Sequence, residues 1–99
     1  MCEFDIIKAN NGSKIAEEIL SLAYTDNNEL ILKDILGSGL KLDSALILDV
    51  NTMSQKCKVL EHPLIKDFLK LMKDINDNKI SSEEISEFQE KLEKLKENL

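Results

Sequence analysis

The sequence predicts an α+β fold that is mainly β, in which a small antiparallel β-barrel or meander is followed by a C-terminal helical hairpin. Three observations give this prediction. Up to residue 61, apolar residues come in short runs separated by turn signals. From Pro63 onwards they recur with the 3.6-residue period of an amphipathic helix. Asn76-Asp77-Asn78 divides this helical pattern in two. We therefore expect a small β domain over residues 1–61 and a helical extension over residues 62–99.

The β domain is expected to contain five or six short strands. The first apolar run, residues 4–9, is followed by Asn11-Gly12, a strong hairpin signal because both residues tolerate positive φ. Residues 15–23 are ambiguous, since their spacing also fits two helical turns, but the strand-like segments around them favour a strand. The later apolar runs, separated by turn residues, cover residues 30–36, 40–50 and 56–60.

The helical extension carries its apolar residues on one face of each helix. Pro63 suits a first helical turn, where its missing N–H costs nothing. Ser81 and Glu84 have the spacing of a capping box at the start of the second helix. The stripe that follows consists of Ile85, Phe88, Leu92, Leu95 and Leu99. Such a stripe is more often internal core than a partner-binding surface, so we expect the hairpin to pack on the sheet or on a second copy.

The composition disfavours nucleic-acid binding and points to a soluble, cytoplasmic protein. All thirteen basic residues are lysines and the net charge is −6, whereas phosphate recognition favours arginine and a basic surface. No apolar run reaches the ~18–20 residues of a membrane span, so we expect no membrane association. The first residues lack the basic start and apolar stretch of a secretory signal. Two cysteines do not make a disulfide framework, which fits a reducing compartment.

Cys2 is the candidate metal ligand. A cysteine is small enough for the preceding methionine to be removed in the cell, which would leave Cys2 with a free α-amine. The amine and the thiolate close a five-membered chelate ring, and this pair of donors suits Ni(II) or Cu(II) in square-planar geometry. A two-fold dimer would bring a second pair and complete four ligands. The ordinary alternative is that Cys2 is a small hydrophobic residue at the start of the first strand.

Several short motifs share their order with a known family. They are the Met1-Cys2 start, the early Asn-Gly turn, and the segments 31–37, 45–50 and 56–60. Together they resemble the CooT family of small nickel-binding proteins, which are associated with maturation of carbon monoxide dehydrogenase. The likeness covers about residues 1–61. Hydrogenase chaperones of the HypC type also begin Met-Cys, but here Glu3-Phe4-Asp5 replaces their apolar-proline continuation.

The resemblance implies a non-enzymatic nickel-binding protein, a metallochaperone or accessory factor for a nickel enzyme such as carbon monoxide dehydrogenase. It implies a homodimer of short β-rich chains in which Cys2 takes part in nickel binding. The helical extension over residues 62–99 has no counterpart in the shortest family members. Proteins like these have also been described as predicted RNA binders, a function that the absence of arginine and the acidic net charge oppose here.

Other residues with chemical potential are interpreted more simply. His62 is the single histidine and is expected to be a surface residue at a strand-to-helix junction, so no hydrolytic triad and no catalytic residue are predicted. Cys57 is expected to pack in the core. The segment from Asp74 to Ser81 has the layout of an EF-hand calcium loop, with Asp74, Asn76 and Asn78 at alternating ligand positions. Lys79 stands where the loop's glycine is expected, and Ile85 where its final glutamate is expected. A capped helical turn explains the same residues without a metal.

A second function from a different class remains open at this point. The chain could be a structural or protein-interaction module without a metal function, in which the helical extension binds a protein partner.

Overall fold

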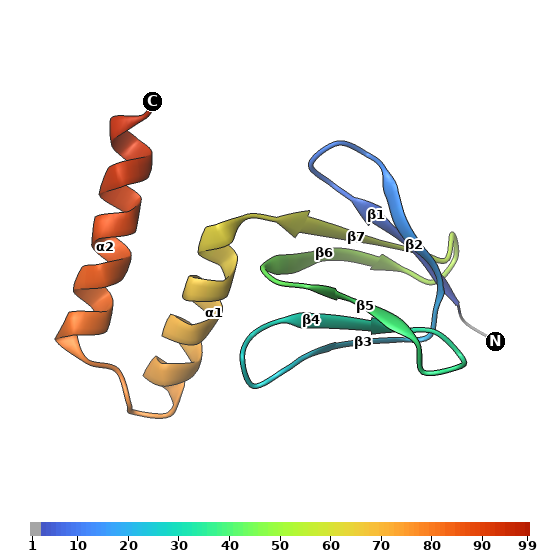
Figure 1. Ribbon diagram of the computed structural model, residues 1–99, viewed down its shortest axis with the longest axis horizontal. Helices are drawn as coiled ribbons and strands as arrows, with labels where there is room; N and C mark the ends of the chain where they lie inside the picture. The colour runs from blue at the N-terminus through green and yellow to red at the C-terminus, as the bar shows by residue number, and fades with distance from the viewer. Residues whose placement is uncertain (1–2) are drawn as a thin grey trace.

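The computed structural model describes residues 3–99, in which seven strands are followed by two helices (Figure 1). The predicted α+β class, mainly β with a C-terminal helical hairpin, is confirmed. The strands are β1 (Phe4–Lys8), β2 (Lys14–Ile19), β3 (Ser21–Tyr24), β4 (Leu30–Lys33), β5 (Gly39–Leu42), β6 (Ala45–Asn51) and β7 (Lys56–Glu61). The helices are α1 (Pro63–Asn76) and α2 (Ser82–Glu97).

Hydrogen bonding divides the strands into two sheets. The first has four strands in the order β2-β1-β7-β6, and the second has three in the order β3-β4-β5. Neighbouring strands pair antiparallel except for β1 and β7, which are parallel with Ile6 opposite Cys57. The expectation of a purely antiparallel arrangement is therefore wrong for this pair. Turn signals indicate pairing between consecutive strands only, whereas β1 and β7 come from opposite ends of the β domain.

The ambiguous segment 15–23 is extended, so the helical alternative is wrong. It forms β2 and β3, which belong to different sheets. Glu18 has a φ of 56°, and the β1–β2 pairing shifts register on either side of Ile6. The backbone N–H of Leu20 then donates to the carbonyl of Lys33 at 2.8 Å, which ties the crossing point to the second sheet. This irregular backbone breaks the alternation that would have marked two strands in the sequence.

The core of the β domain is small and draws on both sheets. Its buried apolar residues are Ile6, Ile19, Leu30, Leu32, Leu42, Ala45, Cys57 and Val59. Tyr24 packs against them, and its hydroxyl donates a 2.7 Å hydrogen bond to the carbonyl of Ala45. Because Tyr24 lies in the three-stranded sheet and Ala45 in the four-stranded one, this bond links the two sheets. Burial raises the pKa of Tyr24, so the hydroxyl stays protonated and able to donate.

Gly39, the first residue of β5, is required by the close approach of β4. A Cβ atom at this position would collide with the backbone carbonyl of Leu32. We expect Gly39→Ala to lower the free energy of unfolding by about 2–4 kcal/mol, because β4 and β5 would have to separate. Gly37→Ala is the matched comparison: Gly37 has a φ of 79° but open space around it, so only ~1 kcal/mol is expected. Urea unfolding measures both variants, and equal losses would contradict the role assigned to Gly39.

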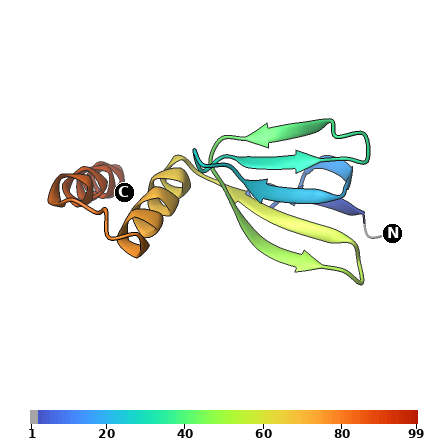
Figure 2. The same cartoon turned by 90° about the horizontal axis from the view of Figure 1, so that it is seen from below.

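The two helices extend the molecule beyond the sheets. In two perpendicular views α1 follows β7 and α2 lies on the side of α1 away from the strands (Figures 1 and 2). Ser44 anchors the junction, since its hydroxyl accepts from the backbone N–H of Lys66 at 2.9 Å. Lys66 also pairs with Asp43 at 2.8 Å. Neither helix contains a buried residue, so the expectation that the α2 stripe is internal core is wrong for this chain alone.

Candidate functional surfaces

The amino-terminal end of the β domain is the place from which Cys2 extends, although Cys2 itself lies outside the described residues. Phe4 begins β1, the strand held between β2 and β7. The backbone N–H of Asp5 donates to the carbonyl of Gln55 at 2.9 Å, which fastens this end to the turn between β6 and β7. Residue 2 is thus separated by one residue from a strand with partners on both sides.

Exposed apolar side chains surround this end of the domain. The β6–β7 turn presents Met53, which is 96% exposed, and the β4–β5 turn presents Ile35 and Leu36 at 67% and 85% exposure. Both turns lie at the end of the sheets where the chain begins (Figure 1). Asp34 shapes the second turn, because its Oδ1 accepts from the backbone N–H groups of Leu36 and Ser38. A turn built in this way holds apolar side chains in water, which is typical of a contact surface.

Cys57 and His62 do not come together as a reactive pair. The Cys57 side chain is fully buried beside Val59, which confirms its predicted place in the core. Burial, followed by the nearby Asp49 carboxylate, raises the pKa of its thiol, so Cys57 is an inert thiol rather than a metal-binding thiolate. His62 follows the far end of β7, about 16 Å along the strand at 3.3 Å per residue.

His62 is an exposed junction residue, as predicted, and it also caps α1. Its Nδ1 accepts a 3.1 Å hydrogen bond from the backbone N–H of Leu64. This role was missed in the sequence, although a polar residue directly before a proline at the first helical position is a recognisable signal. The imidazole therefore has a structural function at this end of the domain.

The loop between the helices holds no calcium cage. Asp74, at the first position of the calcium-loop pattern, pairs through Oδ2 with Lys70 at 2.7 Å, and Lys70 also pairs with Glu84 Oε1 at 2.9 Å. A lysine therefore lies where an EF-hand would hold the cation. Ser81 caps α2 by accepting from the backbone N–H of Glu84 at 3.2 Å. Only half of the predicted capping box forms, because the Glu84 side chain pairs with Lys70 instead of turning back to Ser81.

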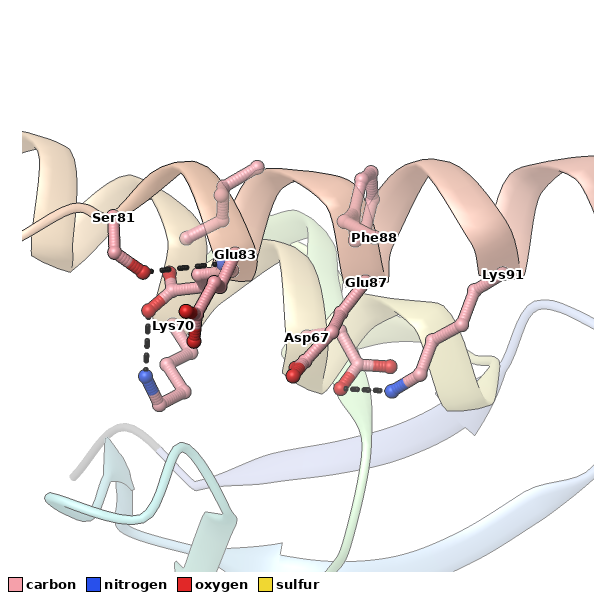
Figure 3. Close-up of a pocket in the computed structure, with 9 residues that line it drawn as sticks. Asp67, Lys70, Ser81, Glu83, Glu87, Phe88 and Lys91 are labelled. Carbon is pink, nitrogen blue, oxygen red and sulfur yellow. Dashed lines mark hydrogen bonds and ion pairs between the residues drawn. The ribbon is translucent and has the colours of Figure 1, made fainter.

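One side of the hairpin between α1 and α2 is a charged cleft (Figure 3). This open cleft has a volume of about 270 Å³, and Lys70 and Lys91 reach across it to acidic partners. Lys91 pairs with Asp67 at 2.9 Å. Hydrogen bonds to Asp74 and then Glu84 raise the pKa of Lys70, while Lys70 lowers the pKa of Asp74. Two of its ion pairs, Lys70–Glu84 and Lys91–Asp67, connect the helices, while the lining as a whole holds four carboxylates against two lysines and is therefore acidic.

The other side of the hairpin is an apolar face. We define it by six side chains that are each 41–46% exposed: Phe68, Met72, Ile75, Ile85, Leu92 and Leu95. The first three lie four and three residues apart on α1, and the last three follow the predicted stripe on α2. The rings of Phe68 and Phe88 join the two halves, with centroids 6.3 Å apart.

A second cleft lies between the β3–β4 turn and α1. It is open, has a volume of about 450 Å³ and is lined by both acids and lysines. Asn28, in left-handed backbone with a φ of 63°, is 95% buried in this turn; its Oδ1 has no hydrogen-bond partner among residues 3–99. Lys73 reaches the carbonyl of Thr25 at 3.5 Å and so crosses the cleft. Its mixed charges match no single class of ligand.

Within residues 3–99, no three histidine, cysteine or acidic side chains gather closely enough to hold a metal ion. The helices in this part of the chain are too short or too polar to cross a membrane. No protein-family model matches the sequence, and no curated protein matches it either.

Proposed function

We propose that this chain is a small non-enzymatic nickel-binding protein that serves as an accessory factor for a nickel enzyme, with Cys2 as its metal ligand. In a chain that begins at Cys2, the α-amine and the thiolate would together occupy two positions of a square-planar Ni(II) site. A second copy would supply the other two positions. The proposal rests on the Met1-Cys2 start and on the resemblance of residues 1–61 to the CooT family.

The main structural support is the position of β1 in the four-stranded sheet. Because β2 and β7 pair with both edges of β1, the chain is held firmly from Phe4 onwards, close to the proposed ligand. Met53, Ile35 and Leu36 lie exposed at the same end and offer apolar contact area to a second copy or to a client enzyme. Cys57 is no competing ligand, since its thiol is buried and its pKa is raised.

Equilibrium dialysis against nickel, using a chain that begins at Cys2, tests this proposal. We expect one nickel ion to be shared by two chains, and a thiolate-to-nickel absorption band to appear. A variant with serine in place of cysteine at position 2 is expected to lose both signals while keeping its circular dichroism spectrum. Cys57→Ser controls for the other thiol and should retain nickel. Equal binding by the Cys2→Ser variant and the unaltered chain would overturn the proposed site.

A further inference from the structure

We infer that the apolar face of the helical hairpin is an interface with a second copy of this chain, and that the two hairpins form an antiparallel four-helix bundle. Neither helix contains a buried residue, so packing within one chain leaves the amphipathic pattern of α1 and α2 unsatisfied. Two amphipathic helices bury only part of their apolar surface against each other, and a second pair of helices completes the core of a bundle.

The apolar face is free in the single chain. The salt bridges Lys70–Glu84 and Lys91–Asp67 lie along the opposite side of the hairpin, where they fix the two helices relative to each other. The sheets contact α1 on the side away from α2, through β6 and through Ser44 and Asp43. Within residues 3–99, the hairpin is therefore linked to the β domain and to itself on two sides and presents its apolar face to solvent.

The exposed area fits a second copy. Six large apolar side chains, each 41–46% exposed, together present on the order of 500 Å² of surface, similar to the largest patch on a typical monomer. Two such faces in contact would bury about 1,000 Å² in total, which is the size at which specific interfaces begin. The face is also self-complementary in chemistry, because all six of its residues are apolar and none is charged.

The charges of α2 favour an antiparallel arrangement of the two copies. The first half of the helix, residues 82–90, contains four glutamates and no lysine. Residues 91–97 contain three lysines and two glutamates. A two-fold axis across the helix places the acidic half of one copy beside the lysine-containing half of the other, whereas a parallel arrangement would place the acidic halves together.

The interface goes beyond the proposed nickel site and does not depend on it. The hairpin lies at the end of the molecule opposite the start of β1 (Figure 1). Association through the helices therefore leaves the amino-terminal end of each copy free, and a dimer formed in this way requires neither nickel nor Cys2.

Sedimentation equilibrium of the full chain, without metal and with serine at position 2, tests the interface. We expect a dimer at micromolar concentrations. Met72→Glu combined with Leu92→Glu places a charge on each helix in the middle of the apolar face and is expected to give a monomer. The matched control is Lys33→Gln combined with Lys58→Gln, which changes the net charge by the same amount at exposed positions on β4 and β7, away from the hairpin, and should remain dimeric.

The charged variant could become monomeric because its helices unfold. A second variant with alanine substitutions separates this cause from loss of the interface. Ile75→Ala combined with Leu92→Ala removes apolar contact area but introduces the best helix-forming residue, so the helices are retained. We expect the dimer dissociation constant to rise at least tenfold. A native chain that is monomeric at 100 µM would overturn the inference, as would face variants that dimerise as well as the control. A chain that begins at Cys2, dimerises and binds no nickel would overturn the proposed function and leave the helical interface standing.

Discussion

Replacing Leu32 by alanine is expected to lower the free energy of unfolding of the β domain by about 3–4 kcal/mol. The Leu32 side chain is fully buried in the middle of β4, where it belongs to a core of eight buried apolar residues among residues 3–99. A cavity at this point removes contacts with both sheets, and the surrounding strands cannot close it without losing their register. Since small domains are stable by only about 5–15 kcal/mol, this single change removes a large part of the total.

Urea unfolding followed by tyrosine fluorescence measures this effect selectively. Tyr24 is the only tyrosine, and its hydroxyl bonds to Ala45 across the two sheets, so its signal reports on the core rather than on the helices. Leu48→Ala is the control, because Leu48 is 51% exposed on β6 and should cost less than ~1 kcal/mol. A Leu32→Ala variant that unfolds together with this control would show that the core lies elsewhere.

The strands could be predicted from sequence because their boundaries are local. Gly12 and Gly37 both adopt positive φ at turns, which is the conformation that their sequence context indicates. The parallel pairing of Ile6 with Cys57 could not be predicted in the same way, since about fifty residues separate the two strands. Its energy comes from burying both side chains in one core, and no short-range pattern records that partnership.

The apolar stripe of α2 also shows that short-range sequence patterns do not determine long-range contacts: its position on the helix could be predicted, but its burial could not. The spacing of Ile85, Leu92 and Leu95 correctly predicts that they share one side of α2. Spacing does not say what covers that side, and no segment among residues 3–99 covers it fully, since each of the three is exposed by 41–45%. The β domain contacts α1 instead: Ser44 and Asp43 bind Lys66 in its first turn, and the carbonyl of Thr25 accepts from Lys73 nearer its end. These contacts leave the stripe on α2 exposed, so packing on the sheet does not make it internal core.

The candidate metal site is the part of the prediction that stays a prediction. The prediction for Cys2 rests on its position in the sequence and on the chemistry of a thiolate beside an α-amine. The fold adds three observations. The strand β1, which follows Cys2 in the sequence, is paired on both edges. The turns at the amino-terminal end of the β domain expose apolar side chains, and the second thiol, Cys57, is buried. His62 caps α1 beyond the last residue of β7, where its Nδ1 accepts from the backbone N–H of Leu64.

Retention of Met1 is expected to weaken nickel binding by at least about 100-fold relative to a chain that begins at Cys2. With Met1 in place, the nitrogen of Cys2 is part of a peptide bond, and the chelate ring of amine and thiolate cannot form without displacing an amide proton. Nickel is then held by one strong donor per chain. Loss of the second donor removes the gain in effective concentration that a chelate provides, which is typically 10²–10⁴-fold.

Competition with a coloured chelator, measured on the two forms of the chain in parallel, gives this ratio directly. Both forms carry the same β domain, and we expect them to unfold at the same urea concentration. Equal midpoints exclude a difference in folding as the cause of a difference in nickel affinity. An acetylated chain that begins at Cys2 is the sharper control, because it keeps the length of the processed form but blocks the amine; it should bind nickel as weakly as the form with Met1. Equal affinity of all three forms would show that the α-amine is not a ligand, and would leave the thiolate to be tested alone by the Cys2→Ser variant.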